Sequence, residues 1–276
     1  MQNKDLKFVF FGTPNIASET LEILRQNGYI PSLIITGSDK PQGRKMLLTP
    51  PPVKVWAEKN NIPYIQPNKV RSNLFESLRS HLSSIDLFIV VAYGKILPEE
   101  IINLPKLGSV NIHYSLLPKY RGASPVETAV LNGDTETGIS IQKIEFKMDS
   151  GPIIAQESIA ISPDEKAQDL RKRLTKIGGE LLVKTLPNFV DGKIKPIPQD
   201  ENKATFCKKI KKEDGLIDLN EDPIKNYNKF RAYATWPRSF FFKNGKRIII
   251  TDATLQNGEF KILKIIPEGG KEINYR

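Results

Sequence analysis

Cysteine and histidine, the residues of disulfides and most zinc sites, are scarce in this sequence. Its 276 residues include one cysteine and two histidines, so Cys207 cannot form a disulfide within the chain. A structural zinc site needs four cysteine or histidine ligands, and the few candidates here are widely spaced. We therefore expect no bound metal.

Long apolar runs are also missing. No run approaches the roughly 20 residues of a membrane-spanning helix, and residues 1–7 lead directly into a strand-like segment with no signal peptide evident. The hydrophobic and charged fractions, 39% and 26%, are ordinary for a globular protein. We expect a cytoplasmic monomer with no membrane association.

What the chain does have is positive charge, with a formal net charge of +10. Residues 203–276 hold 16 Lys and Arg against 9 Asp and Glu. Clustered cations displace counterions from a phosphate backbone, which favours a nucleic-acid partner. The alternative is a generally basic surface without such a partner, and charge alone does not separate the two.

Strand-like and helix-like segments alternate through the first 190 residues. The continuous apolar run over 86–92 is typical of a central parallel strand. This alternation predicts an α/β domain with a mostly parallel sheet. The expected strands cover 8–12, 32–36, 86–92, 108–113, 138–144 and 153–161, and the expected helices cover 16–26, 68–82, 125–131 and 165–190.

The pattern changes near residue 192, where a polar, proline-bearing stretch is typical of a linker. We divide the chain into a first domain over 1–191, a linker over 192–204 and a second domain over 205–276. The second domain reads as a small, mostly β module. Its expected elements are a helix over 223–233 and short strands over 239–242, 247–251 and 260–266.

A long basic loop rich in proline is expected over 37–52, and it contains Arg44 and Lys45. Loops of this length in compact α/β domains are often functional. A surface insertion without function is an equally good interpretation of the loop taken alone.

An amide and an imidazole lie two residues apart in the expected strand over 108–113. Because side chains alternate along a strand, Asn111 and His113 point to the same face. A lone histidine is more often structural, but this strand end is where open α/β sheets place their sites. A proton acceptor beside an amide donor suits acyl transfer. Asp149 follows another expected strand and can orient the imidazole.

A rigid loop, residues 115–118, follows directly. Pro118 fixes its own backbone and restricts Leu117. Beyond the loop, Ser124 and Pro125 suit the N-cap and first position of a helix. Arg121 before that helix is either an exposed cation or an anion contact, and we slightly favour the exposed cation.

These motifs together resemble the 10-formyltetrahydrofolate-dependent formyltransferases, and within that family the enzymes that formylate initiator methionyl-tRNA. The resemblance covers nearly the whole chain. It is carried by Asn111-Ile-His113, Ser115-Leu-Leu-Pro118, Arg121-Gly-Ala-Ser-Pro125 and Met148-Asp149-Ser-Gly151, and by Phe11-Gly-Thr-Pro14, Lys40-Pro-Gln-Gly-Arg44, Pro51-Pro-Val-Lys54, Val91-Ala-Tyr-Gly94, Ala204-Thr-Phe, Lys211-Lys-Glu-Asp-Gly215, Arg231-Ala and Trp236-Pro237.

The resemblance implies a Rossmann-like catalytic domain followed by an OB-like β-barrel domain that binds tRNA. It implies that the formyl group of 10-formyltetrahydrofolate passes to the α-amino group of methionine on initiator methionyl-tRNA, for translation initiation. The closing segment of the second domain comes early, so we expect a shortened barrel lacking a hairpin between Ile250 and Phe260. Carried over by residue, the catalytic set is Asn111, His113 and Asp149, the folate-binding loop is Ser115, Leu116, Leu117 and Pro118, and the tRNA contacts are Arg44 and Lys45.

Three alternatives stay open from the sequence. A formyltransferase for a small amine, such as an amino-sugar nucleotide or glycinamide ribonucleotide, would share the catalytic set but have little use for the basic loop and module. A formyltetrahydrofolate hydrolase would use water as acceptor. A non-catalytic RNA-binding protein would use the OB-like module and leave the catalytic set unexplained.

Overall fold

The computed structural model describes residues 6–43, 45–67 and 85–275. The helix expected over 68–82 and the side chain of Arg44 therefore lie outside the described residues. The chain divides into two compact units. The first holds residues 1–118, 139–157 and 174–203, and the second holds 119–138, 158–173 and 204–276. The second unit thus includes two segments that the sequence led us to place with the first domain.

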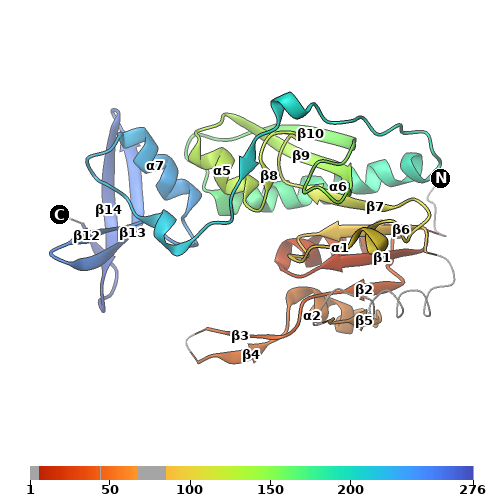
Figure 1. The fold of residues 1–276 in the computed structure, drawn as a ribbon. Helices are drawn as coiled ribbons and strands as arrows, with labels where there is room; N and C mark the ends of the chain where they lie inside the picture. The colour runs from red at the N-terminus through yellow and green to blue at the C-terminus, as the bar shows by residue number, and fades with distance from the viewer. Residues whose placement is uncertain (1–5, 44, 68–84, 276) are drawn as a thin grey trace. The chain divides into compact units, whose positions relative to one another are not determined.

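A seven-stranded sheet forms the framework of the first unit (Figure 1). Its order is β10-β9-β7-β6-β1-β2-β5. Pairing is parallel from β7 through β6, β1 and β2 to β5, and β9 joins β7 antiparallel. This confirms the predicted α/β class with a mostly parallel sheet. The strands are β1 (Phe8–Gly12), β2 (Leu33–Ile35), β5 (Tyr64–Ile65), β6 (Leu87–Val91), β7 (Ser109–His113), β9 (Glu136–Lys143) and β10 (Ile153–Ala160).

The central strands are apolar throughout because both faces of the sheet are covered. Every residue of β1 and of β6 is buried. On one face lies α1 (Asn15–Gln26), which buries Ala17, Leu21 and Leu24 at helical spacing. Val9, Phe11, Phe88, Val90, Tyr93 and Ile101 belong to a single apolar cluster that includes α4 (Glu99–Ile102).

The helix α6 (Ala167–Val190) packs against one face of β7 and β9. A Cβ atom at Gly178 would lie 3.1 Å from Ile112 and 3.5 Å from Ile139, so the helix and the sheet approach closely here. Ile112 therefore faces α6. Its neighbours Asn111 and His113 point to the opposite face, because side chains alternate along a strand.

The expected long loop over 37–52 is more ordered than we predicted. Its middle forms a hairpin of β3 (Lys40–Gln42) and β4 (Leu47–Thr49), followed by α2 (Pro52–Lys59). The hairpin is solvent-exposed, and Met46, Leu47 and Leu48 are each more than 60% exposed. The chain thus holds an apolar, basic tip in open solvent.

The second unit contains a two-stranded sheet, two packed helices and a four-stranded antiparallel sheet. The side chains of Ile217, Tyr227, Phe230, Phe241, Ile248, Ile250, Ala253 and Ile265 form its apolar core. Its elements are β8 (Arg121–Gly122), α5 (Pro125–Leu131), β11 (Phe206–Cys207), a short 3₁₀ helix (Lys212–Gly215), α7 (Pro223–Ala232), β12 (Phe240–Lys243), β13 (Lys246–Gln256), β14 (Glu259–Pro267) and β15 (Ile273–Asn274). Another short 3₁₀ helix, Glu201–Lys203, ends the first unit.

Two tight Asn-Gly turns connect the long strands of this sheet. Asn244 and Gly245 join β12 to β13, Asn257 and Gly258 join β13 to β14, and all four residues have positive φ. Such turns match the twist of a hairpin. The strands expected over 247–251 and 260–266 are therefore longer than predicted, and the interval from Ile250 to Phe260 forms a hairpin whose register shifts between Ile250 and Ala253.

This antiparallel module confirms a small β domain after the α/β domain. Its four strands pair in the linear order β12-β13-β14-β15. Within the described part of the chain, β12 and β15 are not paired with each other, so these four strands form an open sheet. The OB-like barrel stays a prediction.

Candidate active site

The strand β7 positions the two residues that the sequence singled out first. His113 is the last residue of the strand, at the carboxyl edge of the parallel part of the sheet. Asn111 precedes it on the same face and pairs with Val90 of β6. Asn111 is partly buried, and His113 is 5% exposed. Both side chains are therefore held by a rigid element with limited contact to water.

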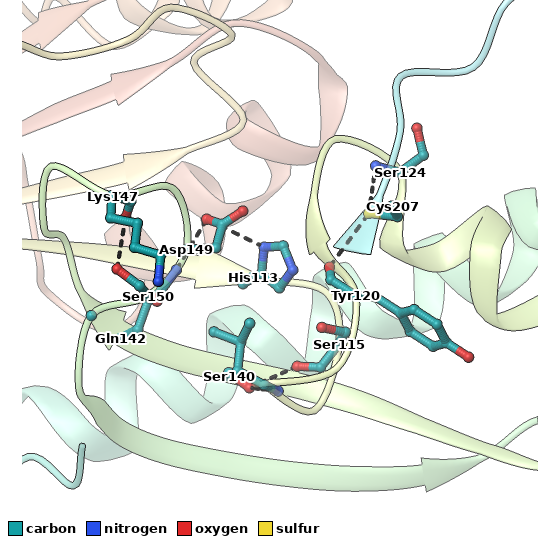
Figure 2. A network of polar contacts seen from close by, with 12 residues as sticks. His113, Ser115, Tyr120, Ser124, Ser140, Gln142, Lys147, Asp149, Ser150 and Cys207 are labelled. Carbon is teal, nitrogen blue, oxygen red and sulfur yellow. Dashed lines mark hydrogen bonds and ion pairs between the residues drawn. The ribbon is translucent and has the colours of Figure 1, made fainter. Parts of the chain in front are cut away.

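Asp149 reaches His113 from the loop between β9 and β10. Its Oδ1 lies 3.7 Å from Nδ1 of His113, with side-chain exposures of 17% and 6% (Figure 2). Asp149 has a φ of 50°, a left-handed backbone that few residues other than glycine adopt. Two residues later, Gly151 passes so close to β9 that a Cβ atom would collide with the carbonyl oxygen of Lys143. The loop is thus bent tightly to present the carboxylate.

Two glutamines that the sequence did not single out hold Asp149, one by its carboxylate and one by its backbone. Gln142 lies directly across from Asn111 in the antiparallel pairing of β7 and β9. Its Nε2 donates to Oδ1 of Asp149 at 3.1 Å (Figure 2). Gln199 donates to the backbone oxygens of Asp149 and Gly151 at 2.9 and 2.7 Å. The role of Gln142 could be predicted only from the register of β7 with β9, and no pattern in the residues around Gln199 indicates its role.

The loop predicted to bind folate, 115–118, is fixed by β9 and β10. Ser140 of β9, opposite His113, donates to the backbone oxygen of Ser115 at 2.7 Å and accepts from the backbone N–H of Leu117 at 2.9 Å (Figure 2). Gln156 of β10 donates to the backbone oxygen of Leu117 at 2.9 Å. Ser115 and Leu117 are buried, Leu116 and Pro118 are partly exposed, and the Leu117–Pro118 peptide is cis.

Arg121 is fully buried, so the exposed cation that we slightly favoured is wrong. It begins β8, which pairs in parallel with β11. Gly122 has a φ of 120°, and a Cβ atom there would lie 2.2 Å from the carbonyl oxygen of Cys207, so only glycine fits. The Cys207 thiol donates to the backbone oxygen of Tyr120 at 3.4 Å and accepts from the backbone N–H of Ser124 at 3.3 Å (Figure 2). Cys207 therefore packs as a structural residue within the second unit.

Tyr93 follows β6 in the segment 91–94 that carried part of the resemblance. Its ring packs at an edge against Phe11, with centroids 5.4 Å apart. Burial raises the pKa of the Tyr93 hydroxyl to about 12. The hydroxyl has no hydrogen-bond partner among the residues that the structure describes. Tyr93 is therefore a neutral, apolar-packed side chain near neutral pH.

Among the described residues, no three histidine, cysteine or acidic side chains cluster as metal ligands would. In the same residues, no helix has both the length and the apolar character needed to cross a membrane. The chemistry that the site offers is an imidazole backed by a carboxylate, with an amide beside it.

Two family models match the chain, one after the other along the sequence. A family model described as formyl transferase matches residues 6–186. A second model, described as formyl transferase, C-terminal domain, matches residues 209–274. The chain belongs to the formyl transferase family. Membership confirms the resemblance drawn from the motifs in both parts of the sequence.

Relatives within the family are about 40% identical to this chain over the aligned residues. It is 39% identical over 269 residues to a methionyl-tRNA formyltransferase of Geobacter sulfurreducens, covering 96% of this chain and 84% of that protein. A methionyl-tRNA formyltransferase of Halalkalibacterium halodurans is 41% identical over 241 residues, covering 87% of this chain and 76% of the relative.

Solved structures share the fold at lower identity. An N-formyltransferase from Helicobacter canadensis, in complex with folinic acid and dTDP-3-aminofucose, matches with a TM-score of 0.71 and 20% identity, covering 98% of both chains. Methionyl-tRNA formyltransferase from Clostridium thermocellum matches with a TM-score of 0.63 and 17% identity, and the match covers 98% of the present chain and 100% of the Clostridium chain. At this identity the likeness establishes the fold.

Proposed function

We propose that this chain transfers the formyl group of 10-formyltetrahydrofolate to the α-amino group of methionine on initiator methionyl-tRNA, and so supports translation initiation. The observation that carries the proposal is the identity of about 40% with methionyl-tRNA formyltransferases over 87–96% of this chain. The juxtaposition of His113 and Asp149 beside Asn111 supplies the groups that the reaction needs.

His113 acts as the proton acceptor in this proposal. The methionyl amine attacks the formyl carbon as a neutral nucleophile and must lose a proton as the new C–N bond forms. Asp149 faces Nδ1 of His113, and this contact orients the ring. Nε2 of His113 is then the nitrogen that takes the amine proton. The proton can pass on to the folate nitrogen as the formyl group leaves it.

Asn111 stabilises the negative charge that develops on the formyl oxygen. Its side-chain amide is a hydrogen-bond donor on the same strand and face as His113. A donor fixed before the reaction lowers the barrier because nothing has to reorganise as charge develops. The acceptor amine is itself the nucleophile, so no covalent intermediate on Ser115 or Cys207 is needed.

The loop 115–118 binds the folate. Buried Leu117 and partly exposed Leu116 supply apolar surface, and the hydrogen bonds from Ser140 and Gln156 fix the loop before ligand arrives. A pre-formed loop loses little entropy on binding. The folate brings the formyl group on its N10 nitrogen. In support of a folate donor, the structurally similar N-formyltransferase from Helicobacter canadensis was solved in complex with folinic acid.

We assign the tRNA acceptor end to the β3–β4 hairpin, and a further tRNA-binding role to the basic C-terminal domain, residues 205–276. Arg44 and Lys45 lie in the segment that joins the two hairpin strands, and Lys45 is exposed. Residues 203–276 add 16 Lys and Arg against 9 Asp and Glu. Cations at both places suit a polyanionic acceptor better than a small amine.

The test compares acceptors at a fixed concentration of 10-formyltetrahydrofolate. Charged initiator tRNA, the same tRNA uncharged, dTDP-3-aminofucose and no acceptor are assayed for tetrahydrofolate release. We expect release only with charged tRNA. Release with the amino sugar at a higher kcat/KM would favour a small-amine formyltransferase. Equal release without an acceptor would favour a hydrolase, and tRNA binding without any release would favour a non-catalytic protein.

A further inference from the structure

Gln199 connects the segment between the two family matches to the loop that carries Asp149. The first match ends at residue 186 and the second begins at residue 209, so Gln199 lies outside both. Its Nε2 lies 2.9 Å from the backbone oxygen of Asp149, 2.7 Å from that of Gly151 and 3.2 Å from Oε1 of Gln142. One amide nitrogen thus meets three acceptors around the same loop.

Two of these acceptors belong to the strained part of the loop. Asp149 has a φ of 50°, and Gly151 lies against the backbone of β9. A left-handed residue persists only where its surroundings over-determine it. Gln199 donates hydrogen bonds to the carbonyl oxygens on both sides of Ser150, so it helps to keep Asp149 in this backbone conformation.

The third acceptor transmits the constraint to the carboxylate itself. Gln142 is 2% exposed, and its amide has one accepting and one donating end. Nε2 of Gln199 has two hydrogens for its three acceptors, so one N–H is shared with Oε1 of Gln142 at 3.2 Å. Because Oε1 is turned toward Gln199, the Nε2 of Gln142 is turned toward Asp149, where it donates to Oδ1 at 3.1 Å. That oxygen is the one 3.7 Å from Nδ1 of His113.

We propose that Gln199 is a positioning residue for formyl transfer, acting through Gln142 and the loop backbone to hold the Asp149 carboxylate against His113. The proposal rests on the proposed function only for the expected effect on the rate of formyl transfer. A carboxylate displaced from Nδ1 would leave the imidazole unoriented, and small misplacements at a reacting centre cost large factors in rate.

Gln199 is not needed to attach its segment to the first unit. Ile197 forms a backbone bridge with Ile153, and both hydrogen bonds of the bridge are 2.8 Å long. This bridge remains when the Gln199 side chain is changed. Gln199→Leu should therefore fold, and its effect should be separable from a loss of structure.

The kinetic test is a double-mutant cycle with Asp149→Asn. We expect Gln199→Leu to lower kcat about 10- to 100-fold, because disrupting a hydrogen bond that orients a catalytic pair typically costs a small part of the 10²–10⁴-fold that acid–base catalysis supplies. The KM for tRNA and for folate should stay within a few-fold of wild type. In the Asp149→Asn background, Gln199→Leu should lower kcat less than threefold, because the group it positions is already altered.

Gln26→Leu is the matched control, since the Gln26 side chain donates to partly buried Glu22 on α1 and to no other residue that the structure describes. It should leave kcat unchanged and shift Tm as little as Gln199→Leu does. A wild-type kcat in Gln199→Leu would overturn the proposal. So would a full 10- to 100-fold effect that persists in the Asp149→Asn background, since that would mean Gln199 acts elsewhere.

A second measurement does not depend on activity. The chain has only two histidines, so the imidazole C–H signals can be assigned by NMR with a His81→Asn variant. At fixed pH, Gln199→Leu should move the His113 signal in the same direction as Asp149→Asn does and leave the His81 signal in place. An unmoved His113 signal would overturn the positioning role. If the wild-type protein transfers no formyl group but Gln199→Leu still shifts the His113 signal, the proposed function is wrong and the positioning role of Gln199 stands.

Discussion

Nδ1 of His113 lies 3.7 Å from Oδ1 of Asp149, and the two residues come from different strand ends of the same sheet. His113 closes β7, whereas Asp149 sits in the turn between β9 and β10. The antiparallel addition of β9 beside β7 is what brings the turn back to the imidazole. The pair can therefore act as a proton acceptor and its orienting carboxylate.

Removing the amide of Asn111 tests the oxyanion role. Losing one such donor costs about 3–4 kcal/mol of barrier, so Asn111→Ala should lower turnover by two orders of magnitude or more. Steady-state kinetics with charged initiator tRNA measures this. Asn103→Ala on the exposed end of α4 is the matched control and should keep full activity. A near-normal turnover number in Asn111→Ala would refute the role.

Removing the charge of Asp149 tests the carboxylate–imidazole pair. General acid–base groups contribute about 10²–10⁴-fold, so His113→Ala should lower kcat by that range. Asp149→Asn keeps the shape and loses the charge, and it should lower kcat within the same range. Because the two residues act as a unit, the double variant should be little worse than His113→Ala alone. Effects that multiply in the double variant would show that the residues work independently.

Arg44→Ala tests the tRNA contact at the β3–β4 hairpin. The variant should raise the KM for tRNA and spare folate affinity, because only the tRNA carries a phosphate backbone. The slope of log affinity against log salt should fall by roughly one unit. Arg25→Ala on α1 removes the same charge elsewhere and should leave the KM for tRNA unchanged. Equal losses for tRNA and folate would contradict the assignment.

Tyr93→Phe tests the buried phenol through stability. Burial raises the pKa of Tyr93 from 10.0 to about 12, so the folded state favours the protonated form. The unfolded chain ionises this group from about pH 10, and the contribution of Tyr93 to stability is complete below that pH and lost as pH rises toward 12. By pH 12 the loss from this one group is about 2–3 kcal/mol.

Denaturant unfolding of wild type and Tyr93→Phe between pH 7 and 11 checks this expectation. The phenylalanine variant should fall less steeply with pH above 10. Near pH 7 it should match or exceed the wild-type free energy of unfolding, by roughly 1–2 kcal/mol, because it removes a buried hydroxyl that has no partner among the described residues. Identical slopes for the two proteins above pH 10 would refute the role assigned to burial.

Local sequence signals predicted the α/β framework well, for physical reasons. Strands with both faces covered, such as β1 and β6, must be apolar throughout, and α1 must place its apolar residues at helical spacing. The strand end that carries Asn111 and His113 followed from alternation alone. The longer strands β13 and β14 were missed although their Asn-Gly turn, Asn257 and Gly258, is a strong hairpin signal.

The pairing of segments far apart along the chain could not be predicted from the sequence. Arg121 looked like an exposed cation because nothing local shows that β11, far along the chain, pairs with its strand. Gln142 and Gln199 were missed for the same reason, since their role depends on the register of β7 with β9 and on a segment returning after α6. Contacts that depend on tertiary register leave no pattern in neighbouring residues.

The most direct measurement is the identity of the product on the tRNA. The chain is incubated with 10-formyltetrahydrofolate and initiator tRNA charged with methionine, the amino acid is released from the tRNA, and it is identified by mass spectrometry. We predict N-formylmethionine with the wild-type protein, and a rate of formation at least two orders of magnitude lower with Asn111→Ala. Unmodified methionine in the wild-type reaction, with the folate donor intact, would contradict the proposed function.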